Sequence, residues 1–194
     1  MLDGSFLLPR GPDAILPHGS VHGGSIGGMN LADYILHDLS SVAPRTRALL
    51  ERLPADKLYF SPGSGLQTVG WNANHLANIP SWPGMIVEQD ELNLDPSQPF
   101  DAETSDHPAK IVATFDRNLE AGRKIIAGAS DEKLAEPWTM KYAGQTLYSM
   151  TKGDVLRTWV VMHLVHHTAI LSSHLRLAGV EMGSLLEEMP GPTL

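Results

Sequence analysis

The sequence predicts an all-α fold, a four-helix bundle with one long crossover connection and a small β-hairpin inserted before the last helix. Four segments carry apolar residues at the spacing of an amphipathic helix. An acidic, proline-containing stretch separates the second segment from the third, and no apolar run reaches the ~18 residues that a membrane span needs. Helices of this kind bury their apolar faces by packing against one another, which favours a bundle.

The chain begins with a segment that follows neither a helical nor a strand pattern. Residues 1–28 are rich in glycine and contain few charged residues. We therefore expect an irregular N-terminal extension over residues 1–28 and one folded, bundle-type domain over residues 29–194. Asn30 is a good helix N-cap, so the first helix should begin directly after it.

The first two helices are predicted from apolar periodicity and from their caps. The first helix should run for about 22 residues, with a kink at Pro44. Thr68 can cap the second helix, in which His75 lies between Trp71 and Ile79 on one apolar stripe. Two prolines should then interrupt this helix.

The long connection is predicted from its charge. Residues 88–106 contain many acidic residues and neither Lys nor Arg, which is typical of an exposed connection. The third helix should cover residues 108–127, because Pro108 is tolerated in a first turn and Gly128 provides a stop.

The last part of the chain predicts a hairpin followed by a helix. Residues 138–150 alternate bulky and polar side chains around Ala143-Gly144, which indicates two short antiparallel strands. The fourth helix should cover residues 154–178, with Asp154 as its cap and Gly179 in a left-handed conformation at its end.

Three histidines are candidates for a metal site. His163 and His167 lie four residues apart on the fourth helix, so both rings can reach one ion. Only one further ligand from a facing helix is needed, and His75 on the second helix is the natural third. Paired core or surface histidines without a metal are the alternative interpretation of this pattern.

The remaining histidines of the helical region are not predicted to be ligands. His166 points to the margin of the same face, which favours a supporting or interface role. His174 lies about 10.5 Å farther along the axis than His167, too far to share an ion, and we expect it at the mouth of a pocket. His37 and His107 occupy ordinary surface positions.

Composition excludes several classes of protein. The chain has 22 acidic against 14 basic residues, a formal net charge of -8, and no cysteine. This charge does not favour nucleic acid or membrane surfaces as partners, and no thiolate metal site or disulfide can form. We expect a cytoplasmic protein that acts on a small molecule.

Four short motifs are similar to those of a known family: Asn74-His75-Leu76, Trp138-Thr139-Met140-Lys141, His163-Leu164-Val165-His166-His167 and Leu175-Arg176-Leu177-Ala178-Gly179. With these motifs, residues 29–180 resemble the DinB/YfiT-like superfamily of metal-binding four-helix bundles. It implies that His75, His163 and His167 hold a divalent metal ion. Thr168 and Ile170 stand where the family typically has Arg and Gln, and His174 stands where it has Tyr.

The predicted function is a metal-dependent enzyme that binds Zn, Ni or Fe at these three histidines. The resemblance implies activation of a low-molecular-weight thiol for S-transfer or isomerisation, in a homodimer. No Asp or Glu lies within one turn of His163 or His167 on their face, so an obvious general base is missing from this helix. A metal-dependent hydrolase and a noncatalytic, dimeric metal- or ligand-binding bundle are the alternatives.

Overall fold

The computed structural model describes residues 29–98 and 102–183, so the extension predicted for residues 1–28 lies outside the described residues. The helices are α1 (Leu31–Glu51), α2 (Val69–Asn78), α3 (Trp82–Glu88), α4 (Pro108–Ala127), α5 (Asp131–Ala135), α6 (Lys152–Val155) and α7 (His163–Leu177). Short 3₁₀ helices cover Ala55–Lys57 and Ile79–Ser81, and a π-helix covers Leu156–Met162. The strands are β1 (Glu91–Leu94), β2 (Pro137–Tyr142) and β3 (Gln145–Thr151).

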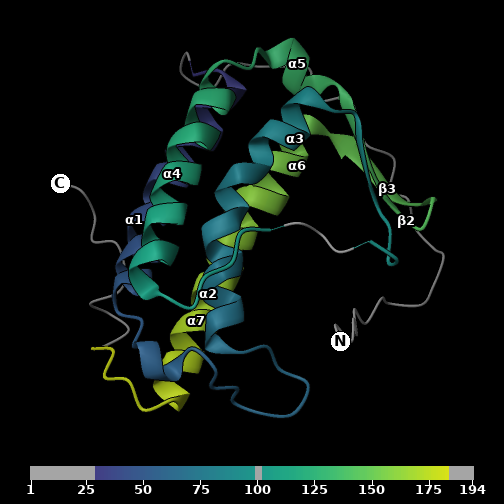
Figure 1. Cartoon of the computed structure of the whole chain (residues 1–194). Coiled ribbons are helices and arrows are strands. Elements are labelled where there is room, and N and C mark those ends of the chain that lie inside the picture. The colour runs from purple at the N-terminus through teal and green to yellow at the C-terminus, as the bar shows by residue number, and fades with distance from the viewer. Residues whose placement is uncertain (1–28, 99–101, 184–194) are drawn as a thin grey trace.

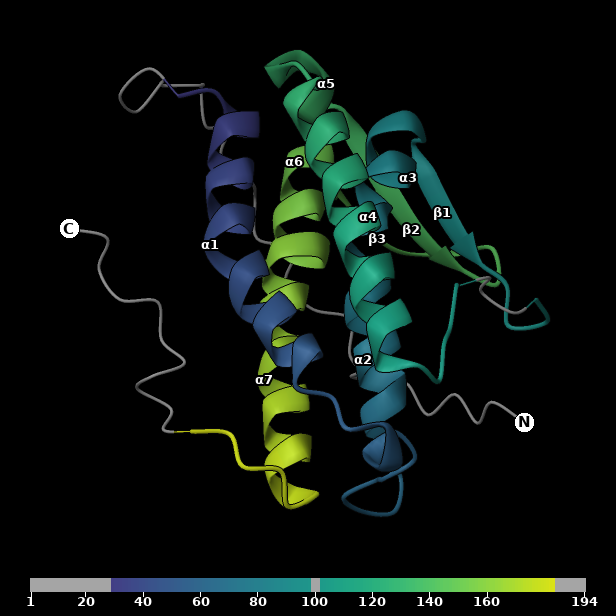
Figure 2. The ribbon, with the colours of Figure 1, turned by 60° about the vertical axis from the view of Figure 1, so that its left-hand side comes forward.

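The protein is mostly helical, with a small sheet at one side (Figure 1). Helices α1 and α2 each pack against both α4 and α7, and Figure 2 shows α1 running alongside α7. The core between them is apolar and includes Ile35, Leu39, Leu76, Phe115 and Leu171. In the part of the chain that the structure describes, no helix combines the length and the apolarity required to cross a bilayer.

Helix α1 begins where the sequence predicts. The side chain of Asn30 accepts a hydrogen bond from the backbone N–H of Asp33 at 2.8 Å, and the Asp33 carboxylate accepts one from Asn30. This reciprocal capping box satisfies two N–H groups that the first turn leaves free. Pro44 lies inside α1 without ending the helix.

The second helical region is divided as the prolines predict. Thr68 caps α2 by accepting a hydrogen bond from the backbone N–H of Trp71. Helix α2 ends before Pro80, the chain passes through a 3₁₀ turn, and α3 starts with Pro83 in its first turn. Proline has no N–H to donate, so each one is placed where a helix begins rather than where it continues.

The last helical region differs from the single α-helix predicted over residues 154–178. It begins at Lys152 with Thr151 as its cap, so Asp154 lies in the first turn rather than at the cap. The seven residues Leu156–Met162 then form a π-helix before α7 starts. The end is as predicted, because Gly179 has a φ of 82°, which a residue without a Cβ adopts at low cost.

The hairpin prediction is confirmed, but the sheet has a third strand and the fold is not purely α-helical. Strands β2 and β3 are antiparallel, and Ala143 and Gly144 form their turn with φ values of 48° and 79°. Strand β1 pairs with β2 in parallel, which gives a mixed sheet of order β1-β2-β3. The connection over residues 88–106 therefore contains regular structure. Four residues in an acidic stretch carry little local signal for a parallel pairing with a distant strand.

A buried lysine joins the sheet to the helices. Lys152, at the start of α6, is 0% exposed. Its ammonium group lies 2.9 Å from the Asp90 carboxylate and 3.0 Å from the Glu136 carboxylate, and it donates to the Val87 carbonyl at 3.1 Å. A charge buried in this way needs such partners, since an unpaired one would cost several kcal/mol. The lysine therefore ties together the end of α3, the start of β1 and the start of β2.

We expect Gly122→Ala to destabilise the protein by about 1–3 kcal/mol, the usual range for overpacking. A Cβ at Gly122 on α4 would lie 2.2 Å from the Pro80 carbonyl oxygen, and this clash outweighs the ~1 kcal/mol that alanine gains over glycine in a helix. The measurement is urea denaturation. Gly128→Ala is the control, because its Cβ would meet the closest atom at 3.5 Å. Equal stability of the two variants would contradict the close approach.

Candidate metal centre

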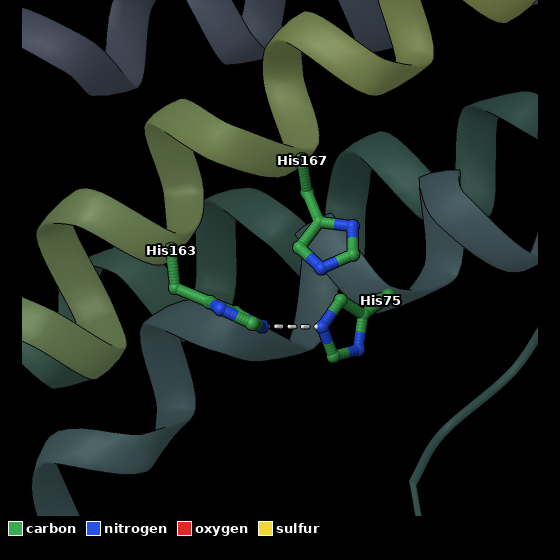
Figure 3. Close-up of side chains that lie close together, drawn as sticks. All are labelled: His75, His163 and His167. Carbon is green, nitrogen blue, oxygen red and sulfur yellow. Dashed lines mark hydrogen bonds between the residues drawn. The ribbon is translucent and has the colours of Figure 1, made fainter. Parts of the chain in front are cut away.

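Three histidines from two packed helices meet at one point. His75 lies in the middle of α2, His163 begins α7, and His167 follows one turn later. Figure 3 shows the three rings turned toward one another. One ligand nitrogen from each ring lies within 4.8 Å of the others, and the Nε2 atoms of His75 and His163 are 2.9 Å apart. The predicted residues are thus brought together.

The spacing of the rings fits a single metal ion. The ring centroids are 4.3 Å apart for His75 and His167, 4.5 Å for His163 and His167, and 5.1 Å for His75 and His163. All three pairs meet edge to face, at 62–75°. Imidazole nitrogens bound to one ion at about 2.1 Å lie roughly 3.0–3.4 Å from one another. Small side-chain movements are therefore enough to place the three nitrogens around one ion.

Burial keeps the three imidazoles neutral. It lowers the pKa of His75 to about 4 and that of His163 to about 4, with smaller contributions from neighbouring histidines. Burial also lowers the pKa of His167 to about 3, and the neighbouring His75, His163 and His166 lower it further. A metal ion binds neutral imidazole, so all three rings are in the binding form at neutral pH.

Aromatic rings enclose the histidines. Trp71 stacks on His75 with centroids 4.8 Å apart, and Trp82 contacts both His75 and His163. Trp159, from the π-helix, lies 5.5 Å from His163 and stacks on Tyr148 of β3. The indole N–H of Trp159 and the hydroxyl of Tyr148 are buried and have no hydrogen-bond partner within the described ranges. These rings cover part of the histidine cluster.

The other histidines lie outside the cluster. His166 is exposed, with its ring 5.1 Å from that of His167. His174 is only 8% exposed and is hydrogen bonded to Asn72, so it is buried rather than at the mouth of a pocket as expected. His37 and His107 are exposed, in agreement with their sequence positions.

Several residues at the site were not found from the sequence. The surrounding rings of Trp82, Trp159 and Tyr148 come from three different elements, and Asn72 contacts His167 from α2. The sequence marks Asn72 only as a polar residue on the buried side of a predicted helix, where it needs a hydrogen-bond partner. The aromatic residues carry no local signal, since large rings are also common in ordinary cores.

Trp71 lies between a cavity and the histidine cluster, since it lines the one and contacts the other. The volume of the cavity is about 660 Å³, and Trp71 and Asn74 line it together with Tyr59, Ser105 and Lys110. Trp71 also stacks on His75, so the cavity and the histidines share this indole. Asn74 also binds the backbone of Ser105, another lining residue: its amide donates to the Ser105 carbonyl and accepts from the Ser105 N–H.

The fold and the site together define a mostly helical protein whose three converging histidines could hold a metal ion. The family model of the DinB superfamily matches residues 38–171, a range that includes all three histidines. The chain therefore belongs to the DinB superfamily, and the resemblance seen in the sequence is confirmed.

A solved structure supports the fold. The chain is similar to a DinB-like protein, YjoA, from Bacillus subtilis, with a TM-score of 0.57 and 17% sequence identity. The match covers 77% of this chain and 94% of YjoA. None of the curated proteins matches the chain in sequence. At this level of identity the similarity establishes the fold, and the chemistry must be argued from the residues of this chain.

We expect the metal-free protein to lose stability as the pH falls from about 6.5 toward 4. The pKa values of His75, His163 and His167 are lower in the folded protein than in the unfolded chain, where histidine titrates near 6.5. The unfolded state therefore binds more protons in this range, and the free energy of unfolding decreases as the pH falls. Urea denaturation in EDTA at pH 7.5 and 5.0 measures the decrease.

The control for this prediction compares two single variants. His167→Ala removes a buried histidine and should show a smaller decrease between pH 7.5 and 5.0 than the wild type. His37→Ala removes an exposed histidine and should follow the wild type. An equal decrease in all three proteins would show that the buried histidines are not responsible.

Proposed function

We propose that the chain binds one divalent metal ion through His75, His163 and His167, and that the loaded site activates a low-molecular-weight thiol for S-transfer or isomerisation. The observation that carries this proposal is the convergence of three neutral imidazoles without a fourth ligand. Among residues 29–98 and 102–183, no further His, Asp or Glu joins the cluster. Zn, Ni and Fe all accept imidazole nitrogen.

The number of ligands supports a catalytic rather than a structural site. Structural zinc sites are usually closed by four protein ligands, whereas catalytic sites keep a position open for water or substrate. An ion bound by three imidazoles supplies a Lewis acid that lowers the pKa of a thiol. The protein contributes neutral ligands, a fixed geometry and the tryptophans that cover part of the cluster.

The charges around the site favour a thiol over water as the nucleophile. The pKa shifts of the three histidines arise from burial and from other histidines, without a contribution from a carboxylate. Hydrolysis commonly uses a general base to take a proton from water, and carboxylates often serve in this role. A thiol already loses its proton near neutral pH when its pKa is lowered, so thiolate attack needs no such base.

The cavity supports a small-molecule substrate. Its volume of about 660 Å³ falls within the usual range for small-ligand sites. Aromatic surface from Tyr59 and Trp71 and charged groups from Asp106 and Lys110 offer both apolar and polar contacts. In S-transfer, the thiol sulfur forms a bond to the acceptor carbon, the leaving group departs with the bonding electron pair, and the thiol proton passes to solvent.

The proposal extends to the architecture and the assembly. A four-helix bundle is supported by the packing of α1 and α2 each against both α4 and α7. A homodimer is supported by apolar side chains that remain exposed on the last helical region, namely Met162 at 61%, Val165 at 49% and Leu177 at 67%.

We expect each of three substitutions to abolish the stoichiometric binding of a divalent metal ion: His75→Ala, His163→Ala and His167→Ala. Two imidazoles alone bind an ion too weakly to compete with water for it. Elemental analysis of the purified proteins measures this. His166→Ala and His174→Ala are the controls and should retain the metal, since neither residue contributes a nitrogen to the cluster. Loss of metal in His166→Ala with retention in His167→Ala would contradict the ligand assignment.

We also expect a chelator to lower the melting temperature of the wild type but not that of the three ligand variants. A metal that binds only the folded state adds about 2.7 kcal/mol to the free energy of unfolding when the free metal concentration is a hundred times the Kd. The measurement is thermal unfolding with and without EDTA. An unchanged melting temperature in the wild type would show that the folded protein does not hold a metal.

The experiment for the activity is a conjugation screen of the metal-loaded protein with low-molecular-weight thiols and electrophilic acceptors. Thiol consumption should require metal, fall to background in His163→Ala and persist in His166→Ala. Hydrolysis of activated esters without thiol conjugation would favour the hydrolase. Metal binding with neither activity would favour a noncatalytic binding protein.

A further inference from the structure

A buried asparagine is hydrogen bonded to one of the three clustered histidines. Asn72 on α2 is 2% exposed, and its side-chain amide contacts three groups. The oxygen Oδ1 lies 3.1 Å from Nδ1 of His167, and the nitrogen Nδ2 lies 3.2 Å from Nδ1 of His174 and 3.2 Å from the Thr68 carbonyl oxygen. Every polar atom of this side chain therefore has a partner.

The carbonyl of Thr68 determines which way the amide faces. A carbonyl oxygen only accepts hydrogen bonds, so the amide nitrogen of Asn72 must face it and donate. The second hydrogen of the same nitrogen points to Nδ1 of His174, which must accept and therefore carries no proton. His174 is thus neutral, with its proton on Nε2, and it supports the same orientation of the amide.

This orientation decides the protonation of His167. The oxygen of Asn72 is left to face Nδ1 of His167, and because an amide oxygen only accepts, Nδ1 must carry a proton. A neutral imidazole carries a single proton, so Nε2 of His167 holds a free lone pair. The lone pair is therefore on the ring nitrogen that Asn72 does not contact.

The other two ligands are not prepared in the same way. The Nε2 atoms of His75 and His163 are 2.9 Å apart and share one hydrogen bond, so one of them carries a proton there. That proton has to move before both nitrogens can bind an ion. Of the three histidines, His167 is the one hydrogen bonded to Asn72, which makes it the ligand with a preset tautomer.

We propose that Asn72 is a positioning residue of the metal centre: its amide oxygen holds the proton of His167 on Nδ1 and thereby presents the Nε2 lone pair to the ion. The inference rests on the proposed metal site. Groups that hold the second nitrogen of a ligating histidine fix its tautomer and orientation, and their loss typically weakens metal binding 10–100-fold.

The first test reads the tautomer directly in the metal-free protein. In ¹⁵N-labelled protein at pH 7, long-range ¹H–¹⁵N spectra should show a protonated Nδ1 and an unprotonated Nε2 for His167. Asn72→Leu keeps the branched shape but removes the acceptor, and it should give a mixture of tautomers.

The second test measures the affinity for Zn²⁺ by competition with a chromophoric chelator. Asn72→Leu should bind Zn²⁺ about 10–100-fold more weakly than the wild type. The matched control is Asn78→Leu. Asn78 is also a buried amide on α2, but its side chain donates to the carbonyls of Asn74 and Glu103 instead of to a histidine. This variant should retain the wild-type tautomer and affinity.

Two results would overturn the inference. One is a proton on Nε2 of His167 in the wild type. The other is an unchanged tautomer and Zn²⁺ affinity in Asn72→Leu, in a protein whose wild type binds Zn²⁺. Failure of the proposed function is distinguishable, because it would appear as an absence of Zn²⁺ binding in the wild type.

Discussion

The packing of α2 against α7 is the contact on which the candidate site depends, because α2 carries one of the three histidines and α7 carries the other two. Burying polar rings between helices costs free energy unless they find partners. Here the rings contact one another, an asparagine and several aromatic side chains. The same burial keeps the imidazoles neutral, which is the form that binds a metal ion. Helix packing therefore both assembles the ligands and sets their protonation.

The sheet and the π-helix serve this site as well as the fold. Strand β3 brings Tyr148 against Trp159, with the two rings 5.9 Å apart and nearly parallel. Trp159 lies in the π-helix and contacts His163 four residues later. π-helical segments are frequently found at functional sites, where the wider turn changes the direction of side chains. Lys152 joins the sheet to the helices, because its buried ammonium group is paired with the exposed carboxylates of Asp90 and Glu136.

Membership of the DinB superfamily accounts for the arrangement of the helices, and this chain's own residues account for its departures from the family pattern. Thr168 and His174, two of the three positions at which the sequence departs from the pattern that the resemblance implies, are buried. The hydroxyl of Thr168 lies 2.7 Å from that of Thr46, and His174 is hydrogen bonded to the amide of Asn72. These two residues therefore take part in hydrogen bonds inside the protein.

The sequence by itself determined the features that depend on neighbouring residues: the cap at Asn30, the bounds of α4, the hairpin turn at Ala143-Gly144 and the pair His163 and His167 on one helix face. These follow from local hydrogen bonds and side-chain periodicity. Only the tertiary structure decided the pairing of β1 with β2, the π-helix, the aromatic enclosure and the contact between Asn72 and His167. Those features join segments that are distant in sequence, or depend on how such segments pack, and local patterns do not encode which distant surfaces meet.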